Sequence, residues 1–259
     1  MHPRKAALLW SGGKDSALAL HHARCDNAEF EVVALVTCLS QAYDRVSMHG
    51  VRRALIADQA DAVGLPVQFV VIPSAPNQSC PMAHSEPGTT FPPNDVYSAA
   101  MLSAFADLKR AGIEAVVFGD IYLEDLRAYR DKLLTHAGLV GRYPLWGRDP
   151  DELYEQFVAR GFRAVTVCVD TARLSETHLG RPLDSAFRKT LTAAVDPCGE
   201  RGEYHSFVFD GPIFRRPVPF AQGAVHRHAP FAFQELYPVG ADEMTFPTKS
   251  VQVTGSVPT

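Results

Sequence analysis

The chain has 259 residues, 46% of them hydrophobic and 21% charged, and this composition is typical of a globular protein with one large domain or two smaller ones. The net charge of -4 and the lack of a basic stretch disfavour a nucleic-acid partner, and the lack of a long apolar run disfavours a membrane partner. The five cysteines are scattered, without a Cys-x-x-Cys pair, which is typical of a reduced, cytoplasmic protein.

Strand and helix patterns alternate through the first half of the chain. Nearly continuous apolar runs predict strands, and apolar residues at helical spacing predict the helices between them. The predicted strands cover residues 6–10, 31–36, 67–72 and 115–118, and the predicted helices begin at residue 17 and cover 51–63 and 94–111. Repeated strand–helix units of this kind imply a parallel sheet that is covered on both faces.

The segment between Pro73 and Pro93 interrupts this pattern. It is rich in Pro, Ser, Asn and Gly, and a loop of this length inside a compact domain is typical of a lid over a functional site. Cys80 and His84 lie within it, but two candidate metal ligands are weak evidence for a zinc site.

The second half of the chain predicts a smaller α/β region. Asp149, Pro150 and Glu152 form a helix start, with Asp as N-cap, Pro at the first helical position and Glu at the third. Helices are predicted over residues 123–137, 149–160 and 184–194, strands over 164–169 and 204–209, and an antiparallel hairpin region after residue 215. We therefore expect a first domain over residues 1–121, a second over 122–236 and a loose tail over 237–259.

Residues 11–16, with the sequence Ser-Gly-Gly-Lys-Asp-Ser, form a glycine-rich turn between the first strand and the first helix. Such a turn aims backbone N–H groups and the positive end of a helix dipole at one point, where an anion is favoured. Gly12 and Gly13 let the backbone approach a ligand closely, and Lys14 adds a full positive charge. The spacing differs from that of the Walker motif. The turn predicts a phosphate-binding site.

Two further clusters carry reactive side chains. Gly119 and Asp120 follow the fourth strand, whose end would lie beside residues 11–16 in an open parallel sheet. Asp120 is predicted to hold Mg²⁺ or a substrate amine, or to cap the following helix. The loop 196–205 gathers carboxylates, a thiol and an imidazole beside two glycines, which suits proton transfer or Mg²⁺ binding but also a solvated turn. Its Cys198 is either a nucleophile or a packed thiol.

Residues 11–16 resemble the PP-loop of the ATP pyrophosphatases, which split ATP into AMP and pyrophosphate. The likeness extends to Gly119-Asp120-Ile121, Pro144-Leu145-Trp146, Gly180-Arg181 and the Cys-Gly-Glu-Arg-Gly-Glu-Tyr-His segment at 198–205. Together these segments resemble the diphthine–ammonia ligase family over residues 6–214, and residues 123–130 resemble its bacterial relatives of unassigned substrate more closely. The chain departs from the family pattern at Leu126, Leu134 and Ser206, where Gln, Cys and Thr are usual.

The resemblance implies an α/β fold, with a parallel-sheet, HUP-like PP-loop domain of the adenine nucleotide alpha hydrolase type and a smaller α/β acceptor domain. It implies an ATP-dependent ligase, with ATP and Mg²⁺ as cofactors, that forms an amide through an acyl-adenylate. The partners would be a carboxylate acceptor, such as a modified protein side chain, and ammonia or an amine. The implied binding residues are Ser11, Gly12, Gly13, Lys14, Asp15, Ser16, His49, Gly119, Asp120 and Arg127, with Asp120 as metal ligand. The implied catalytic residues are Lys14, Asp15, Glu200, Glu203 and His205.

The loop 198–205 is predicted to fold back over the nucleotide site and to form the wall that receives the acceptor. Glu200 or Glu203 would then bind Mg²⁺ or take a proton from the incoming amine, while His205 would orient the acceptor. Two other functions stay open: a PP-loop enzyme that modifies RNA, and a non-catalytic sensor of ATP or AMP. A homodimer also stays open as the assembly.

Overall fold

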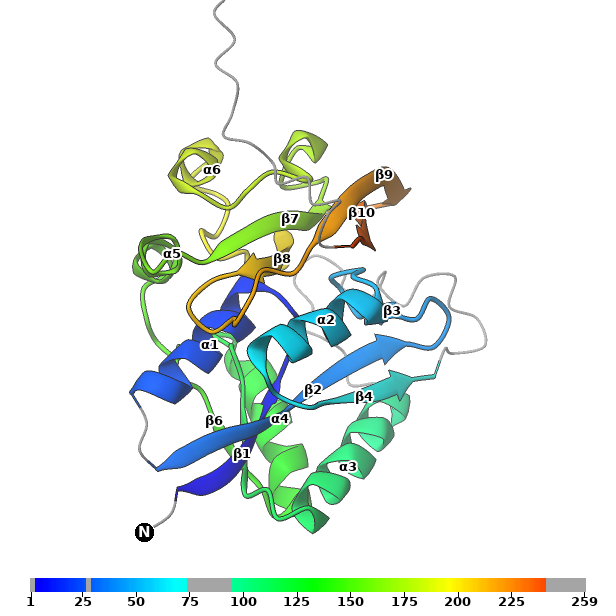
Figure 1. Cartoon of the computed structure of the whole chain (residues 1–259), viewed down its shortest axis with the longest axis vertical. Helices are drawn as coiled ribbons and strands as arrows, with labels where there is room; N and C mark the ends of the chain where they lie inside the picture. Colours follow the sequence, from blue (N-terminus) through cyan, green and yellow to red (C-terminus); the bar gives the residue numbers. More distant parts are fainter. Residues whose placement is uncertain (1–2, 27–28, 74–94, 241–259) are drawn as a thin grey trace, which may run out of the picture.

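A computed structural model describes residues 3–26, 29–73 and 95–240 of the chain, which form two sheets (Figure 1). In the first sheet, β4, β2, β1, β5 and β6 are parallel neighbours in that order, and β3 pairs with β2 in the antiparallel sense. Its strands are β1 (Arg4–Leu9), β2 (Phe30–Ser40), β3 (Arg45–Val46), β4 (Val67–Ile72), β5 (Ala115–Val117) and β6 (Val140–Arg142).

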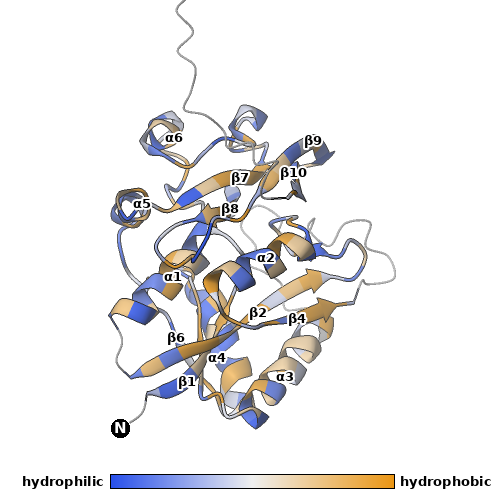
Figure 2. Ribbon diagram, viewed as in Figure 1, coloured by the Kyte–Doolittle hydropathy of each residue, from blue (hydrophilic) through white to orange (hydrophobic). Residues whose placement is uncertain are grey.

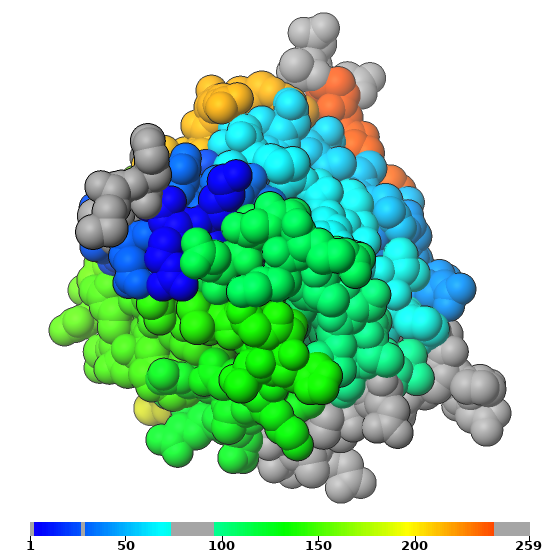
Figure 3. All heavy atoms as spheres, turned by 90° about the horizontal axis from the view of Figure 1, so that it is seen from below, coloured from blue at the N-terminus to red at the C-terminus, as the bar shows by residue number. Residues whose placement is uncertain are grey.

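Helices cover both faces of this sheet. Because side chains alternate along a strand, Leu8 packs with Leu55 on one face, whereas Ala7 packs with Phe105 on the other. The first face carries α1 (Lys14–Cys25) and α2 (Arg53–Val63), and the second carries α3 (Asp95–Arg110) and α4 (Glu124–Ala137). Figure 3 shows the residues of α3 and α4, in green, spread across one outer face of the molecule.

The second sheet is antiparallel, with the strand order β8-β7-β10-β9. It contains β7 (Arg163–Asp170), β8 (Tyr204–Asp210), β9 (Phe220–His228) and β10 (Phe231–Pro238), and α5 (Pro150–Ala159), the 3-10 helix η1 (Glu176–His178) and α6 (Ser185–Thr190) belong to the same half. Helices α1 and α2 lie between the two sheets, and Figure 2 shows hydrophobic residues concentrated along β2, β4 and β7. One continuous core therefore joins the halves.

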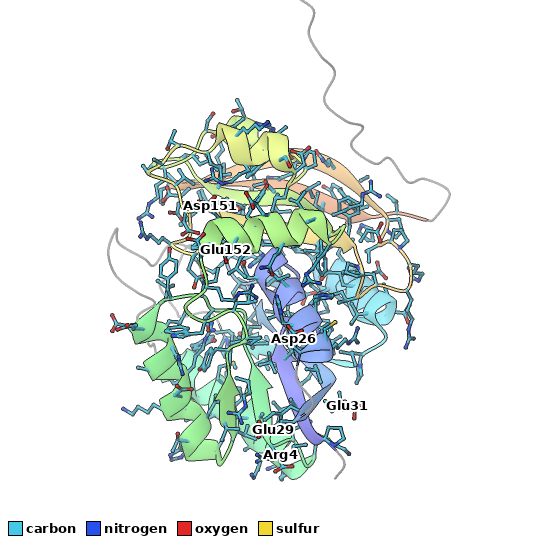
Figure 4. All side chains as sticks on the ribbon, turned by 90° about the vertical axis from the view of Figure 1, so that its left-hand side faces the viewer. Arg4, Asp26, Glu29, Glu31, Asp151 and Glu152 are labelled. Atoms are coloured by element: carbon cyan, nitrogen blue, oxygen red, sulfur yellow. The ribbon has the colours of Figure 1, made fainter. Side chains whose placement is uncertain are left out.

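The expected fold class is confirmed: a mostly parallel sheet carries helices on both faces, and a smaller unit follows. The predicted helix start at Asp149 is also confirmed, because its carboxylate accepts the backbone N–H groups of Asp151 and Glu152 at 2.8 and 3.2 Å. Figure 4 labels Asp151 and Glu152 at the start of α5. The helix expected over 184–194 ends at Thr190. The short strands β3 and β6 were not predicted, since two or three residues carry no period.

The expected boundary at residue 122 differs from the observed sheets. After β5, helix α4 crosses back to β6, which pairs with β5 in parallel, so the first sheet continues to Arg142. Strand β10 runs to Pro238, two residues into the predicted tail. The predicted lid, with Cys80 and His84, lies outside the described residues. Among the described helices, none is both long and apolar enough to cross a membrane.

Candidate active site

A cavity of about 800 Å³ opens at the carboxyl ends of β1 and β5, the place where parallel sheets bind ligands. The first half lines it with four residues of the loop 11–16, all but Gly12 and Gly13, and with residues 46–49, Gly119, Asp120 and Arg130. The second half lines it with residues 198–202 and 204–206. The structure therefore brings the predicted loop of the second half against the predicted phosphate site.

Two glycines allow the close backbone approach at this point. Gly12 has a φ of +78°, and a Cβ there would lie 2.6 Å from Oε1 of Gln59. Gly119 lies so close to the loop that a Cβ would be 2.8 Å from the carbonyl carbon of Asp15. Any larger residue at either position would push the end of β5 or the helix α2 away from the loop.

Lys14 joins the two halves through a buried ammonium group. Its side chain is 3% exposed, and Nζ lies 2.5 Å from Oδ1 of Asp15 and donates a hydrogen bond to the carbonyl oxygen of Cys198. Burial alone would lower the pKa of Lys14, but Asp15, Cys198 and Glu200 together outweigh it and raise the pKa. Burial raises the pKa of Asp15 despite the adjacent Lys14. The ammonium group therefore stays charged.

The loop 196–206 is folded by two carboxylates that do not line the cavity. Asp196 accepts the N–H of Cys198 at 2.8 Å and the hydroxyl of Tyr122 at 2.8 Å. Glu203 is 0% exposed, and its two oxygens accept the N–H groups of Asp196 and Arg201, both at 3.1 Å. The structure places Glu203 beneath the loop, so the predicted catalytic role does not fit it: both of its oxygens are used to hold backbone.

Glu200 is the carboxylate of this loop that reaches the cavity. Its Oε1 accepts the backbone N–H of Ile121 at 2.9 Å, which fastens the loop to the end of β5. Burial first, and then the negative charge of Asp15, raise the pKa of Glu200 to about 8. A carboxylate with such a pKa can exchange a proton near neutral pH.

Two neutral histidines face the cavity from opposite halves. The rings of His49 and His205 lie 4.6 Å apart, and Nδ1 of His49 lies 3.1 Å from the carbonyl oxygen of Ser206. Burial lowers the pKa of His49 to about 4 and lowers the pKa of His205 well below its ordinary value. The buried Nε2 of His205 has no hydrogen-bond partner among the described residues, so a ligand in the cavity can take it.

Ser206 and Ser16 make hydrogen bonds that hold the loop 11–16 and the start of α1. The hydroxyl of Ser206 accepts the backbone N–H of Lys14 at 3.1 Å, which leaves the start of α1 supported from the second half. Ser16 donates to the carbonyl oxygen of Gly13 at 2.9 Å, and its hydroxyl lies 3.3 Å from that of Ser11. The hydroxyls at 11 and 16 therefore stay beside the first turn of α1, and their role at a phosphate site stays a prediction.

Asp120 lies in the cavity but is already paired. Its Oδ2 accepts a hydrogen bond from Arg130, and both residues line the cavity. Asp120 does not cap α4, because the N-cap of that helix is Leu123 and no side chain bonds there. The alternative expectation of a capping role is therefore wrong.

Arg127 was the arginine that the family likeness indicated, and the structure places it elsewhere. It is 39% exposed, stacks over the rings of Tyr143 and Trp146, and is absent from the residues that line the cavity. Arg130, almost one turn further along α4, faces the cavity instead. Sequence reasoning missed Arg130, although a three-residue step along a helix could have suggested it.

The thiol of Cys198 is packed. It donates to the carbonyl oxygen of Pro150 at 3.3 Å, and burial raises its pKa to about 12. A thiol with this pKa is almost entirely protonated at neutral pH, so it does not fit a nucleophile.

The carboxylates that line the cavity are the candidate ligands for a metal ion. Among the described residues, no group of three or more His, Cys, Asp or Glu side chains is arranged to hold a metal ion. Asp15, Asp120 and Glu200 nevertheless line the same cavity. Since Mg²⁺ commonly takes one or two carboxylates together with phosphates and water, this donor set fits a magnesium ion that arrives with a nucleotide.

Comparison with known proteins places this site in a family. Residues 4–75 match the model of the diphthamide synthase N-terminal domain, and residues 149–232 match that of the C-terminal domain of the same protein. The chain belongs to the diphthamide synthase family. The first match contains the loop 11–16 and His49, and the second contains the loop 198–205, whereas Gly119, Asp120 and Arg130 lie between the two matched segments.

Comparison with individual proteins finds relatives over most of the chain. A protein of Schizosaccharomyces pombe is 29% identical over 232 residues, covering 85% of this chain and 37% of its own length. Proteins of Bos taurus and Homo sapiens are 25% and 24% identical, each covering 88% of this chain and 87% of its own length. All three relatives are named diphthine–ammonia ligase. The chain thus spans little more than a third of the fission-yeast relative.

Proposed function

We propose that this chain is an ATP-dependent ligase of the diphthine–ammonia ligase type, which forms an amide through an acyl-adenylate. The observation that carries the proposal is the meeting of the phosphate loop with Glu200 in one cavity. A phosphate site alone would fit a sensor of ATP or AMP. A carboxylate whose pKa is raised to about 8 beside that site adds the proton acceptor that bond formation to an amine needs.

The nucleotide would occupy the wall formed by the first half. Its phosphates would bind at residues 11–16, where the dipole of α1 and the charge of Lys14 favour anions, with Arg130 across the cavity. His49 and Gly119 would border the same nucleotide. When bound, Mg²⁺ would neutralise phosphate charge, and Asp15 and Asp120 are the carboxylates that could hold it while Glu200 acts as the proton acceptor.

The reaction would have two steps. A carboxylate oxygen of the acceptor attacks the α-phosphorus of ATP, the bond between the α-phosphorus and the bridging oxygen breaks, and pyrophosphate leaves. Ammonia or an amine then attacks the acyl carbon, AMP leaves with the bonding electron pair, and an amide forms. Glu200 takes the proton that the nitrogen loses, while Lys14 balances the charge of the departing phosphates.

The acceptor and the amine would enter from the side of the second half. His205 would orient the acceptor through its unpartnered Nε2, in keeping with the role predicted for it. By analogy with the name of the relatives, the acceptor is diphthine and the nitrogen donor is ammonia. A cytoplasmic location and a possible homodimer remain predictions.

Product analysis tests this proposal. The purified chain is incubated with ATP, Mg²⁺, an ammonium salt and elongation factor 2 that carries diphthine. We expect AMP, pyrophosphate and amidated acceptor in equal amounts. ADP and phosphate as the products would refute the adenylation. Tight binding of ATP or AMP without turnover of any carboxylate acceptor would favour a non-catalytic sensor of these nucleotides. AMP formation that depends on RNA would favour an RNA-modifying enzyme.

A further inference from the structure

A second, smaller cavity lies beside β3. It has a volume of about 200 Å³, and its lining residues come from the end of β2, the short strand β3 and its flanks, and the β9–β10 hairpin. We call it the hairpin pocket. The residues on which its chemistry depends are Ser40, Arg45, Val46, His226, His228 and Phe233.

Ser40 gives the hairpin pocket an unsatisfied polar group. Its side chain is 4% exposed, and its buried hydroxyl has no hydrogen-bond partner among the described residues. A buried hydroxyl without a partner lowers stability, so native proteins rarely leave one unless a water or a ligand completes it. Ser40 is one of the residues that line the pocket, so a ligand seated there is the group that could complete its hydroxyl.

The charges around the hairpin pocket favour an anion. Glu235 is buried, and its two oxygens accept hydrogen bonds from Arg45 at 2.9 and 2.7 Å and from Arg52 at 2.7 Å. Two guanidinium groups thus share one carboxylate, which leaves one positive charge in excess. His226 and His228 lie on the same face of β9, and Nε2 of His226 is 3.6 Å from Oε2 of Glu235. His228 can donate a hydrogen bond through one ring nitrogen even when it is neutral.

Another part of the lining is apolar. It includes Val46 and Phe233, and the ring of His228 lies 6.3 Å from that of Phe233. A ligand that fits both parts of the lining carries an oxyanion at one end and a compact apolar body at the other. We propose that the hairpin pocket binds a small organic carboxylate. The buried hydroxyl of Ser40 and the excess charge at Arg45 would hold the carboxylate group, while Val46 and Phe233 would cover the apolar body.

A short segment of the chain, residues 46–49, connects the hairpin pocket with the nucleotide site. Val46 lines both cavities, and residues 47–49 continue from it to His49, which borders the loop 11–16. Arg45 reinforces this segment, because it also donates to the carbonyl oxygen of Gly50 at 2.9 Å. A carboxylate in the pocket should therefore change the affinity for ATP, and ATP should change the affinity for the carboxylate by the same factor.

Titration calorimetry on the full chain tests the site, with benzoate, acetate and inorganic phosphate as the probes. We expect saturable binding of one benzoate per chain that weakens in Ser40→Ala, and weaker binding of acetate because it lacks an apolar body. Phosphate can also bind at the proposed phosphate site of residues 11–16, so only phosphate binding that weakens in Ser40→Ala belongs to the hairpin pocket, and we expect none. Phosphate that bound there more tightly than benzoate would show that the pocket takes a bare oxyanion and overturn the carboxylate assignment. If neither benzoate nor acetate bound, the site would be overturned. The same titration in Lys14→Ala should still show benzoate binding, because this site does not require the proposed ligase activity.

Ser40→Ala separates a binding role from a structural one. We expect benzoate binding to weaken by about threefold to tenfold, because one hydrogen bond to a charged group is lost. The free energy of unfolding without ligand should not fall, since the hydroxyl has no partner to lose. A clear fall would show that the hydroxyl is satisfied within the protein and would contradict the proposal.

Arg227→Gln is the matched control. Arg227 lies between the two histidines on β9 but on the other face, where it pairs with Glu176 at 2.6 Å. Its removal changes the net charge of the strand without touching the hairpin pocket, so benzoate affinity should stay the same. His228→Ala should weaken benzoate binding. An equal loss in Arg227→Gln and His228→Ala would show attraction to the general charge of the hairpin and refute a defined site.

Discussion

The two halves of the molecule supply the same cavity in different ways. The first half delivers its groups through backbone geometry: a strand ends, a glycine turn follows, and α1 begins with its N–H groups aimed at one point. The second half delivers Glu200 through an irregular loop that Asp196 and Glu203 hold in shape. Secondary structure fixes the first wall, whereas buried side chains fix the second.

The loop also shows how two similar residues acquire different tasks. Glu200 and Glu203 are three positions apart. Glu200 borders the cavity, where burial and the charge of Asp15 raise its pKa to about 8. Glu203 lies below the loop with both oxygens bonded to backbone N–H groups. Chemistry and scaffolding are thus divided between two side chains of the same type.

The largest expected effect tests this division. Glu200→Gln should lower turnover by about 10²–10⁴-fold, because an amide cannot accept the proton, while it leaves ATP affinity within a few-fold. Glu203→Gln is the matched variant in the same loop. It should lower the free energy of unfolding by about 1–3 kcal/mol, because an amide has only one acceptor oxygen for two N–H groups.

The measurements are steady-state turnover, ATP titration and chemical unfolding on both variants. If Glu203→Gln lost turnover at unchanged stability while Glu200→Gln kept it, the two assignments would have to be exchanged.

Lys14 links the two walls, and its removal should give the next largest effect. Lys14→Met takes a charge from the phosphate site and leaves the carbonyl oxygen of Cys198 and the carboxylate of Asp15 without their donor. We expect ATP affinity to fall about tenfold to a hundredfold, since a charge-assisted hydrogen bond contributes about 1.5–3 kcal/mol. Calorimetry measures this change.

Lys109→Met is the control for Lys14→Met. Lys109 also donates to a backbone carbonyl oxygen, that of Gly138 at 2.6 Å, but it is exposed and far from the cavity along α3. ATP affinity should not change in this variant. Equal losses in Lys14→Met and Lys109→Met would mean that net charge, and not the buried position of Lys14, governs nucleotide binding.

The difference between the walls also explains what the sequence could predict. The position of the loop 11–16 between β1 and α1 and the helix start at Asp149 follow local rules of periodicity and capping, so the structure confirms these two predictions. The pairing of β6 with β5 and the direction of Glu203 depend on contacts between residues far apart in the chain. The composition of the loop 196–205 indicated a site, but it contains no information on which carboxylate faces inward.

A pH profile sharpens the assignment of Glu200 further. Its folded pKa of about 8 lies above its ordinary value of 4.5, so turnover should rise about tenfold per pH unit below pH 8 and level off above it. The folded state binds this proton more tightly than the unfolded state. The contribution to stability is therefore fully present below pH 4.5 and is lost as the pH rises to 8.

Two variants test whether Glu200 causes the rising limb of the pH profile, which is the part below pH 8. Glu200→Gln should flatten the turnover profile near pH 8 and lessen the loss of stability between pH 4.5 and 8. The pKa of His49, lowered by burial to about 4, keeps that ring neutral throughout this range, so His49→Gln should leave the position of the limb unchanged. If the rise in turnover moved to another pH in His49→Gln and persisted in Glu200→Gln, the titrating group would be His49 and not Glu200.

The smallest expected effect concerns an arginine that the sequence pattern favours and the structure does not. Arg127→Met removes an exposed guanidinium that stacks on Tyr143 and Trp146 and lies 3.6 Å from Asp131. Such contacts contribute about 0.5–1 kcal/mol to stability, and ATP affinity should stay within twofold. Arg130→Met is the informative partner, because it removes a cation from the cavity and leaves the buried Asp120 unpaired. It should weaken ATP binding severalfold more than Arg127→Met does. ATP titrations of both variants decide between the two arginines: a larger loss in Arg127→Met would mean that α4 turns its 127 side toward the nucleotide when ATP binds.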